Sequence, residues 1–189
     1  MTKTFSFNTF NDACSKNISN SLKECNPKGL TPVFVCIGSD LVLGDSLGPL
    51  IGTFLRNKGV KTFVYGNLSY PITAKEVGLA GDYIKKNHPN TITVAIDAAV
   101  GNQEDVGLIR TSNSSIKPGL GVNKNLEKIG DISIIGVVSG KSLQNESLFN
   151  LTRLNLVYKM AEVIANGIEN YLLSLESNAF LERKFSYGA

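Results

Sequence analysis

The chain has 189 residues, 42% of them hydrophobic and 19% charged, with a formal net charge of +3. This composition is typical of one globular domain with a sizeable core and excludes an intrinsically disordered chain. The Lys and Arg residues are scattered and no run is long and apolar enough to cross a membrane, so we expect neither a nucleic-acid nor a membrane partner. The amino-terminal stretch lacks the apolar region of a signal peptide, and the three cysteines show no metal-binding spacing. Their odd number fits reduced thiols in a cytoplasm.

Residues 1–30 read as a helical lead-in to a core that spans about 31–173. Phe10, Cys14, Ile18 and Leu22 recur every four residues. This spacing predicts a helix over about 10–25 with one apolar stripe. We expect the stripe to pack on the domain or on a partner subunit, which leaves homo-oligomerisation open.

The most informative stretch covers residues 31–49 and predicts a strand, a glycine-rich loop and a helix. Val33–Ile37 is a continuous apolar run, as in a strand buried on both faces of a parallel sheet. The loop runs from Gly38 to Pro49, and helical spacing of apolar residues begins at Leu47. We expect Gly38 and Gly48 to serve tight turns.

Beyond this stretch, strands and helices alternate. We expect strands over 62–65, 91–96, 106–110 (at a sheet edge) and 132–138, and helices over 75–86 and 148–173. Residues 174–189 read as a short mixed tail that is frayed or swapped onto a neighbour. The alternation predicts a single α/β domain over residues 1–189, a three-layer α/β/α arrangement with a mostly parallel sheet.

Aspartates follow two of the predicted core strands. Asp40 and Asp45 come after the strand that ends at Ile37, and Asp97 comes after the strand that ends at Ile96. Loops that leave the carboxyl ends of parallel strands gather at one edge of a sheet, so these carboxylates converge if the two strands are neighbours. Two such groups can share a proton for acid–base hydrolysis or can hold a divalent metal. Asp45 taken alone is also a normal helix cap.

Other chemistries are less well supported. The single histidine, His88, precedes the strand at 91–96 and so belongs to the opposite end of the sheet from Asp97, which argues against a nucleophilic triad. Residues 136–142 carry a GKS sequence after a strand, but the spacing is one residue short of a phosphate-binding P-loop. A Gly-x-Gly at 119–121 lacks the third glycine of a dinucleotide site.

Four blocks of the sequence resemble one protein family. They are CIGSDLVLGDSLGPLIG, AIDAAVG, KPGLGVNK and IGDISIIGVV, at residues 36–52, 95–101, 117–124 and 129–138. In this order they resemble the YyaC-type sporulation proteins of endospore-forming bacteria, over about residues 31–173. That family looks like a relative of the spore germination protease and, more distantly, of the hydrogenase maturation peptidases, which share a phosphorylase/hydrolase-like α/β fold.

The resemblance implies a spore-associated, endopeptidase-like hydrolase in the cytoplasm of a forespore or spore. Asp45 and Asp97 match the aspartates of the germination protease, an atypical aspartic peptidase, and would be the catalytic pair acting on a protein or peptide, with small acid-soluble spore proteins as the expected substrate. The maturation peptidases add a histidine metal ligand, which has no counterpart here, so we expect a metal-free pair and no cofactor. Asp40, Asn123 and Lys124 are candidate substrate-binding residues. The alternatives are a non-catalytic module that binds a spore protein or peptide, and a metal-dependent site.

Overall fold

The computed structural model describes residues 1–118, 127–141 and 152–186, with side chains described as far as 177. Twelve elements follow one another along these ranges: β1 (Thr4–Asn8), α1 (Cys14–Cys25), β2 (Thr31–Cys36), η1 (Gly44–Ser46), α2 (Leu47–Asn57), β3 (Val64–Tyr65), α3 (Val77–Asn87), β4 (Thr91–Gly101), η2 (Gln103–Asp105), β5 (Leu108–Ser112), β6 (Ile132–Gly140) and α4 (Leu154–Ser186).

The strands form one six-stranded sheet in the order β1-β5-β6-β4-β2-β3. β3, β2, β4 and β6 run parallel, whereas β5 is antiparallel to both of its neighbours. Because β1 pairs with β5, the predicted edge position of the strand near 106–110 is wrong. Part of the predicted lead-in is therefore the true edge of the sheet.

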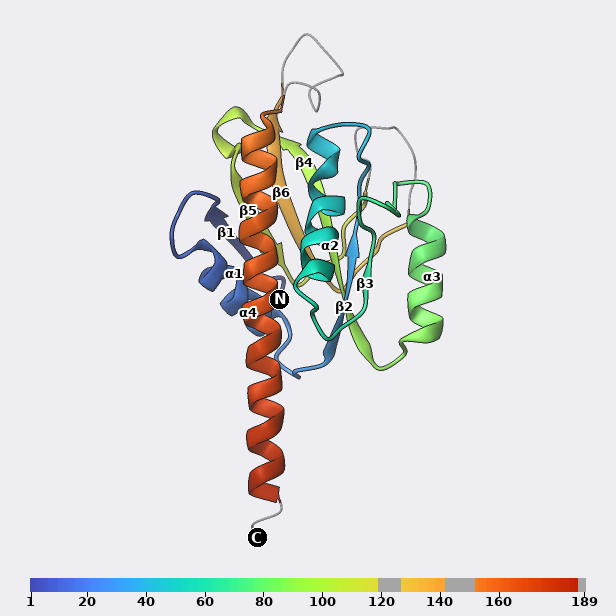
Figure 1. The fold of residues 1–189 in the computed structure, drawn as a ribbon, viewed down its shortest axis with the longest axis vertical. Helices are drawn as coiled ribbons and strands as arrows, with labels where there is room; N and C mark the ends of the chain where they lie inside the picture. Colours follow the sequence, from blue (N-terminus) through green and yellow to red (C-terminus); the bar gives the residue numbers. More distant parts are fainter. Residues whose placement is uncertain (119–126, 142–151, 187–189) are drawn as a thin grey trace.

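Helices cover both faces of the sheet, as predicted for three layers (Figure 1). One apolar cluster joins α1, α2 and α4 to one face and contains Phe34, Ile96 and Ile134. A smaller cluster joins α3 to the other face through Val35 and Ala95. Side chains alternate along β4, so Val94, Ile96 and Ala98 face α4, whereas Ala95 faces α3.

The first and last helices differ from the sequence-based expectation. Cys14, Ile18 and Leu22 of α1 are buried in the cluster with α4, and Gly167 of α4 lies so close that an added Cβ would be 2.9 Å from Ile18. The apolar stripe of α1 therefore packs on the domain, and it is not a surface for a partner subunit. α4 continues to Ser186 and projects well beyond the body of the molecule, so residues 174–186 are helical and not a mixed tail.

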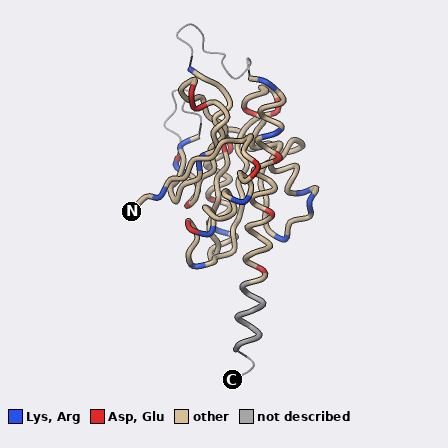
Figure 2. The backbone as a smooth tube through the Cα atoms, turned by 90° about the vertical axis from the view of Figure 1, so that its left-hand side faces the viewer, with Lys and Arg blue, Asp and Glu red and all other residues tan. Residues whose placement is uncertain are grey.

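Charged side chains of both signs are interspersed along the described chain (Figure 2). None of the described helices combines the length and the apolar character that a membrane span requires.

Candidate functional site

The site predicted from the two aspartates lies where β2 ends beside β4. These strands are parallel neighbours, and their register pairs Cys36 with Ile96. This confirms the adjacency on which the predicted convergence depends. The N–H of Ile37 donates to the carbonyl of Ile96 at 2.8 Å, and Gly38 begins the loop that carries Asp45.

The loop after β2 folds tightly back on itself, which keeps Asp45 near the carboxyl end of β2. The Ser39 N–H donates to the Asp45 carbonyl at 3.1 Å. Gly38 has a φ of 141°, and a Cβ at this position would lie 2.0 Å from the same carbonyl oxygen. Only glycine allows this close approach, so Gly38 serves the turn, as predicted.

Asp45 does not cap a helix through its side chain. It lies in η1, and α2 begins after Ser46 with no side-chain capping hydrogen bond. Partial burial raises the pKa of Asp45 above its usual value, while a hydrogen bond from the backbone of Ser39 opposes this shift. The capping explanation for this residue is thus not supported by the geometry.

Asp97 lies inside β4, not in a loop after it. The strand was expected to end at Ile96 but continues to Gly101, paired with β6 throughout and with an irregularity between Ala99 and Val100. Asp97 is two positions from Ala95, so it belongs to the α3 face of the sheet. Only 8% of Asp97 is exposed.

The environment of Asp97 favours its protonated form. Burial, with the nearby Asp45 charge as the second cause, raises the pKa of Asp97 to about 8, although the Ala98 N–H donates to its Oδ1 at 2.9 Å and acts in the opposite direction. Asp97 therefore keeps its proton near neutral pH. The two carboxyl groups are close enough to influence each other, and they titrate as a pair.

Of the other predicted site residues, only Asp40 lies within the described part of the chain. Asp40 is exposed in the turn after β2, near the same edge as Asp45. Asn123 and Lys124 lie outside the described residues, as does most of the glycine-rich loop that carries them. The described ends of that loop are joined by the Ile116–Ile129 bridge, and Ile129 packs in the apolar cluster on the α3 face.

The histidine and the cysteines offer no nucleophile to the pair. His88 follows α3 immediately before β4, at the opposite end of the sheet as predicted, and its Nε2 is hydrogen-bonded to the Tyr65 hydroxyl at 2.7 Å. All three thiols are buried and free, and burial raises the pKa of Cys14 to about 11 and that of Cys36 still further. Cys36 is a core residue, as expected.

The described residues do not supply a metal site either. No group of three or more His, Cys, Asp or Glu side chains within them is placed to hold an ion.

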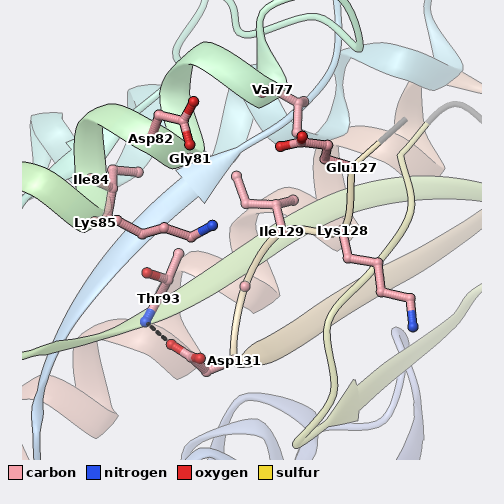
Figure 3. Close-up of a pocket in the computed structure, with 12 residues that line it drawn as sticks. Val77, Gly81, Asp82, Ile84, Lys85, Thr93, Glu127, Lys128, Ile129 and Asp131 are labelled. Atoms are coloured by element: carbon pink, nitrogen blue, oxygen red, sulfur yellow. Dashed lines mark hydrogen bonds between the residues drawn. The ribbon is translucent and has the colours of Figure 1, made fainter. Parts of the chain in front are cut away.

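Sequence reasoning missed a small pocket of about 130 Å³ on the α3 face (Figure 3). It lies between α3 and residues 127–131, with Thr93 of β4 at its base. The Lys85 side chain extends into the hollow, whereas Lys128 points away from it, and the Thr93 N–H donates to Asp131 at 2.9 Å. Thr93 and Asp97 share one face of β4 about 13 Å apart along the strand. No motif marks this pocket, because its residues come from three separate segments.

Comparisons with known proteins identify the family. Residues 6–167 match the family model described as "Protein of unknown function (DUF1256)". The uncharacterized protein YyaC of Bacillus subtilis (strain 168) is 40% identical over 152 residues, which are 80% of this chain and 73% of that protein. Among solved structures, the [NiFe] hydrogenase maturation protease HycI from Thermococcus kodakarensis KOD1 aligns with a TM-score of 0.47 and 16% identity, over 79% of this chain and 99% of that one. The extent of the family match and the identity to YyaC show that the chain belongs to the DUF1256 family.

Proposed function

We propose that this protein is a peptidase-like hydrolase in which Asp45 and Asp97 activate a water molecule for attack on a peptide bond. The observation that carries the proposal is the coupled pair itself: Asp97 within β4 and Asp45 in the loop that follows the neighbouring strand β2, with the pKa of Asp97 raised to about 8. Paired titratable groups whose environments separate their pKa values are a recurring basis for acid–base catalysis.

The environments of the two groups suggest separate roles. Asp45 is the more exposed of the two, so it is the one suited to take a proton from water. Asp97 keeps its proton near neutral pH and is suited to hydrogen-bond the scissile carbonyl oxygen and then protonate the leaving amine. The proton that Asp45 accepts replaces the one that Asp97 gives up, so the pair returns to its starting charge after one turnover.

The substrate class comes from the sequence resemblance and not from the site. The four blocks that resemble sporulation proteins, and their likeness to the germination protease, favour small acid-soluble spore proteins cleaved in the cytoplasm of a spore. Exposed Asp40 stands where it could contact a bound peptide, and Asn123 and Lys124 keep the same proposed role.

One observation favours a second function, a module that binds a protein or peptide without cutting it. Asp97 is 8% exposed, so a substrate must displace part of the surrounding chain to reach it. A peptide could instead occupy the α3 face beside Lys85 and the pocket at Thr93 while the buried carboxyl remains inaccessible.

A cleavage assay separates these functions. Wild type, Asp45→Asn and Asp97→Asn are incubated with small acid-soluble spore proteins, with and without chelator, and intact masses are recorded. Fragments from wild type alone, in both buffers, are the expected result. Asp12→Asn is the matched control, because Asp12 is exposed and far along the chain from the pair. Binding without fragments would favour the second function, and loss of cleavage in chelator would refute the metal-free pair.

A further inference from the structure

A larger pocket, of about 510 Å³, lies at the carboxyl end of β6, and neither Asp45 nor Asp97 lines it. It is bounded by the end of β6 at Lys141 and by the start of α4 at Arg153. Val138, which also lines it, belongs to the core cluster shared with α4, whereas Asp97 belongs to the α3 face. The volume is within the usual range for a small-molecule site.

One buried polar atom in this pocket has no partner. Thr152 is only 7% exposed, and its Oγ1 makes no hydrogen bond. Buried hydroxyl groups are normally hydrogen-bonded, and an exception calls for a missing ligand or water. Thr152 is two residues before α4, so it is close along the chain to the first N–H groups of a long helix, which have no acceptor within the helix.

The charges around the pocket have one sign. Lys141 and Arg153 line it, and no described Asp or Glu does. Within the described ranges neither cation forms an ion pair. The Lys141 N–H donates to the Gly101 carbonyl at 2.8 Å, which holds its backbone against the end of β4. Two cations, a hydroxyl donor and a helix amino terminus together are suited to a phosphate group.

The remaining wall of the pocket is apolar. Phe10, Val106 and Leu156 line it, and Phe10 is 59% exposed although it is aromatic. Phe10 lies in the turn between β1 and α1, which begins at Cys14. This wall gives the non-phosphate part of a ligand an apolar or aromatic contact surface.

We propose that this pocket binds a small molecule that carries a phosphate group and an apolar or aromatic part. The phosphate contacts Thr152, Lys141 and Arg153 at the start of α4, and the apolar part lies against Phe10. This site differs from a P-loop, whose phosphates bind the helix that directly follows the loop. Here the glycine and lysine at the end of β6 meet a helix that begins at Leu154.

Calorimetric titration of the full chain at low salt tests the proposal, with inorganic phosphate and phenyl phosphate as probes. Wild type should bind both, and phenyl phosphate more tightly. We expect three variants, Thr152→Val, Lys141→Gln and Arg153→Gln, each to lower the affinity for both probes by about tenfold or more, because each removes a donor to the charged phosphate. Phe10→Ala should weaken only phenyl phosphate. Lys128→Gln, which removes a cation from the α3 face, is the matched control and should change neither affinity.

Thr152→Val also separates binding from stability. Valine replaces an unpaired hydroxyl by a methyl group, so the melting temperature of the free protein should rise while phosphate affinity falls. Failure of wild type to bind either probe at millimolar concentration would overturn the proposal. So would equal affinities in wild type and the three pocket variants. Equal affinity for the two probes would refute the proposed contact between Phe10 and an apolar part of the ligand, and would indicate free phosphate as the ligand.

Discussion

Replacement of Asp97 by asparagine should stabilise this protein near neutral pH while it abolishes cleavage. The folded pKa of Asp97 is about 8, whereas an aspartate in an unfolded chain has a pKa of about 3.9. Between these values the folded protein holds a proton that the unfolded chain has released. The contribution of Asp97 to stability is therefore complete below about pH 4 and is lost as the pH rises to about 8.

The size of the effect follows from the proton difference. One proton held only by the folded state lowers the free energy of unfolding by about 1.4 kcal/mol per pH unit. From pH 5 to pH 7 the free energy of unfolding of the wild type should fall by about 3 kcal/mol relative to that of Asp97→Asn, because the asparagine amide does not titrate. The side-chain oxygen of asparagine can still accept the Ala98 N–H, so this local hydrogen bond is kept.

Urea unfolding of wild type and Asp97→Asn at pH 5, 6, 7 and 8 measures this difference directly. The gap between the two free energies should widen with pH. In Asp45→Asn the pH-dependent loss of stability should end at a lower pH than in wild type, because removal of the Asp45 charge lowers the pKa of Asp97. Asp12→Asn should follow wild type throughout. Parallel curves for wild type and Asp97→Asn would show that Asp97 is ionised in the folded protein, and its role as proton donor would fail.

Two further predictions concern the surroundings of the pair. Gly38→Ala should lower the free energy of unfolding by about 1–3 kcal/mol and reduce cleavage more than Gly59→Ala does, because only at Gly38 would a Cβ collide with the Asp45 carbonyl. Thermal unfolding measures the stability of the two variants and the cleavage assay measures their activity. Equal effects of the two substitutions would refute the explanation. Both glycines have positive φ, 64° at Gly59 and 141° at Gly38, so alanine is strained at both positions and more strained at Gly38. The thiols should react with a thiol reagent only at the rate of unfolding, because all are buried; immediate labelling of Cys36 in the native protein would contradict its place in the core.

The main elements of the fold were predictable because their sequence patterns are local. Val33–Ile37 is a run of buried residues, and the helix from Leu47 repeats apolar residues at helical spacing. The predictions of this strand and helix required no knowledge of distant contacts. The convergence of Asp45 and Asp97 was expected on the condition that their two strands are neighbours, and β2 and β4 are neighbours.

The elements that were missed depend on long-range pairing. β1 is short, and its residues become a strand only by antiparallel pairing with β5, about a hundred residues later in the chain. The edge position expected for β5 failed for the same reason. The end of α4 was not predicted, because the polar residues after Leu173 interrupt the apolar repeat, yet a helix continues through them.

The length of β4 explains the electrostatics of the candidate pair. Had the strand ended at Ile96, Asp97 would have been a loop residue with access to water and an ordinary carboxylate. Because β6 runs beside β4 as far as Gly140, Asp97 lies within the sheet, opposite Ile135 on one side. On its other side β2 has already ended at Cys36, so the space is filled by the loop that carries Asp45. A long strand beside a short one thus buries one aspartate and brings the second to it, which gives two identical side chains different affinities for a proton.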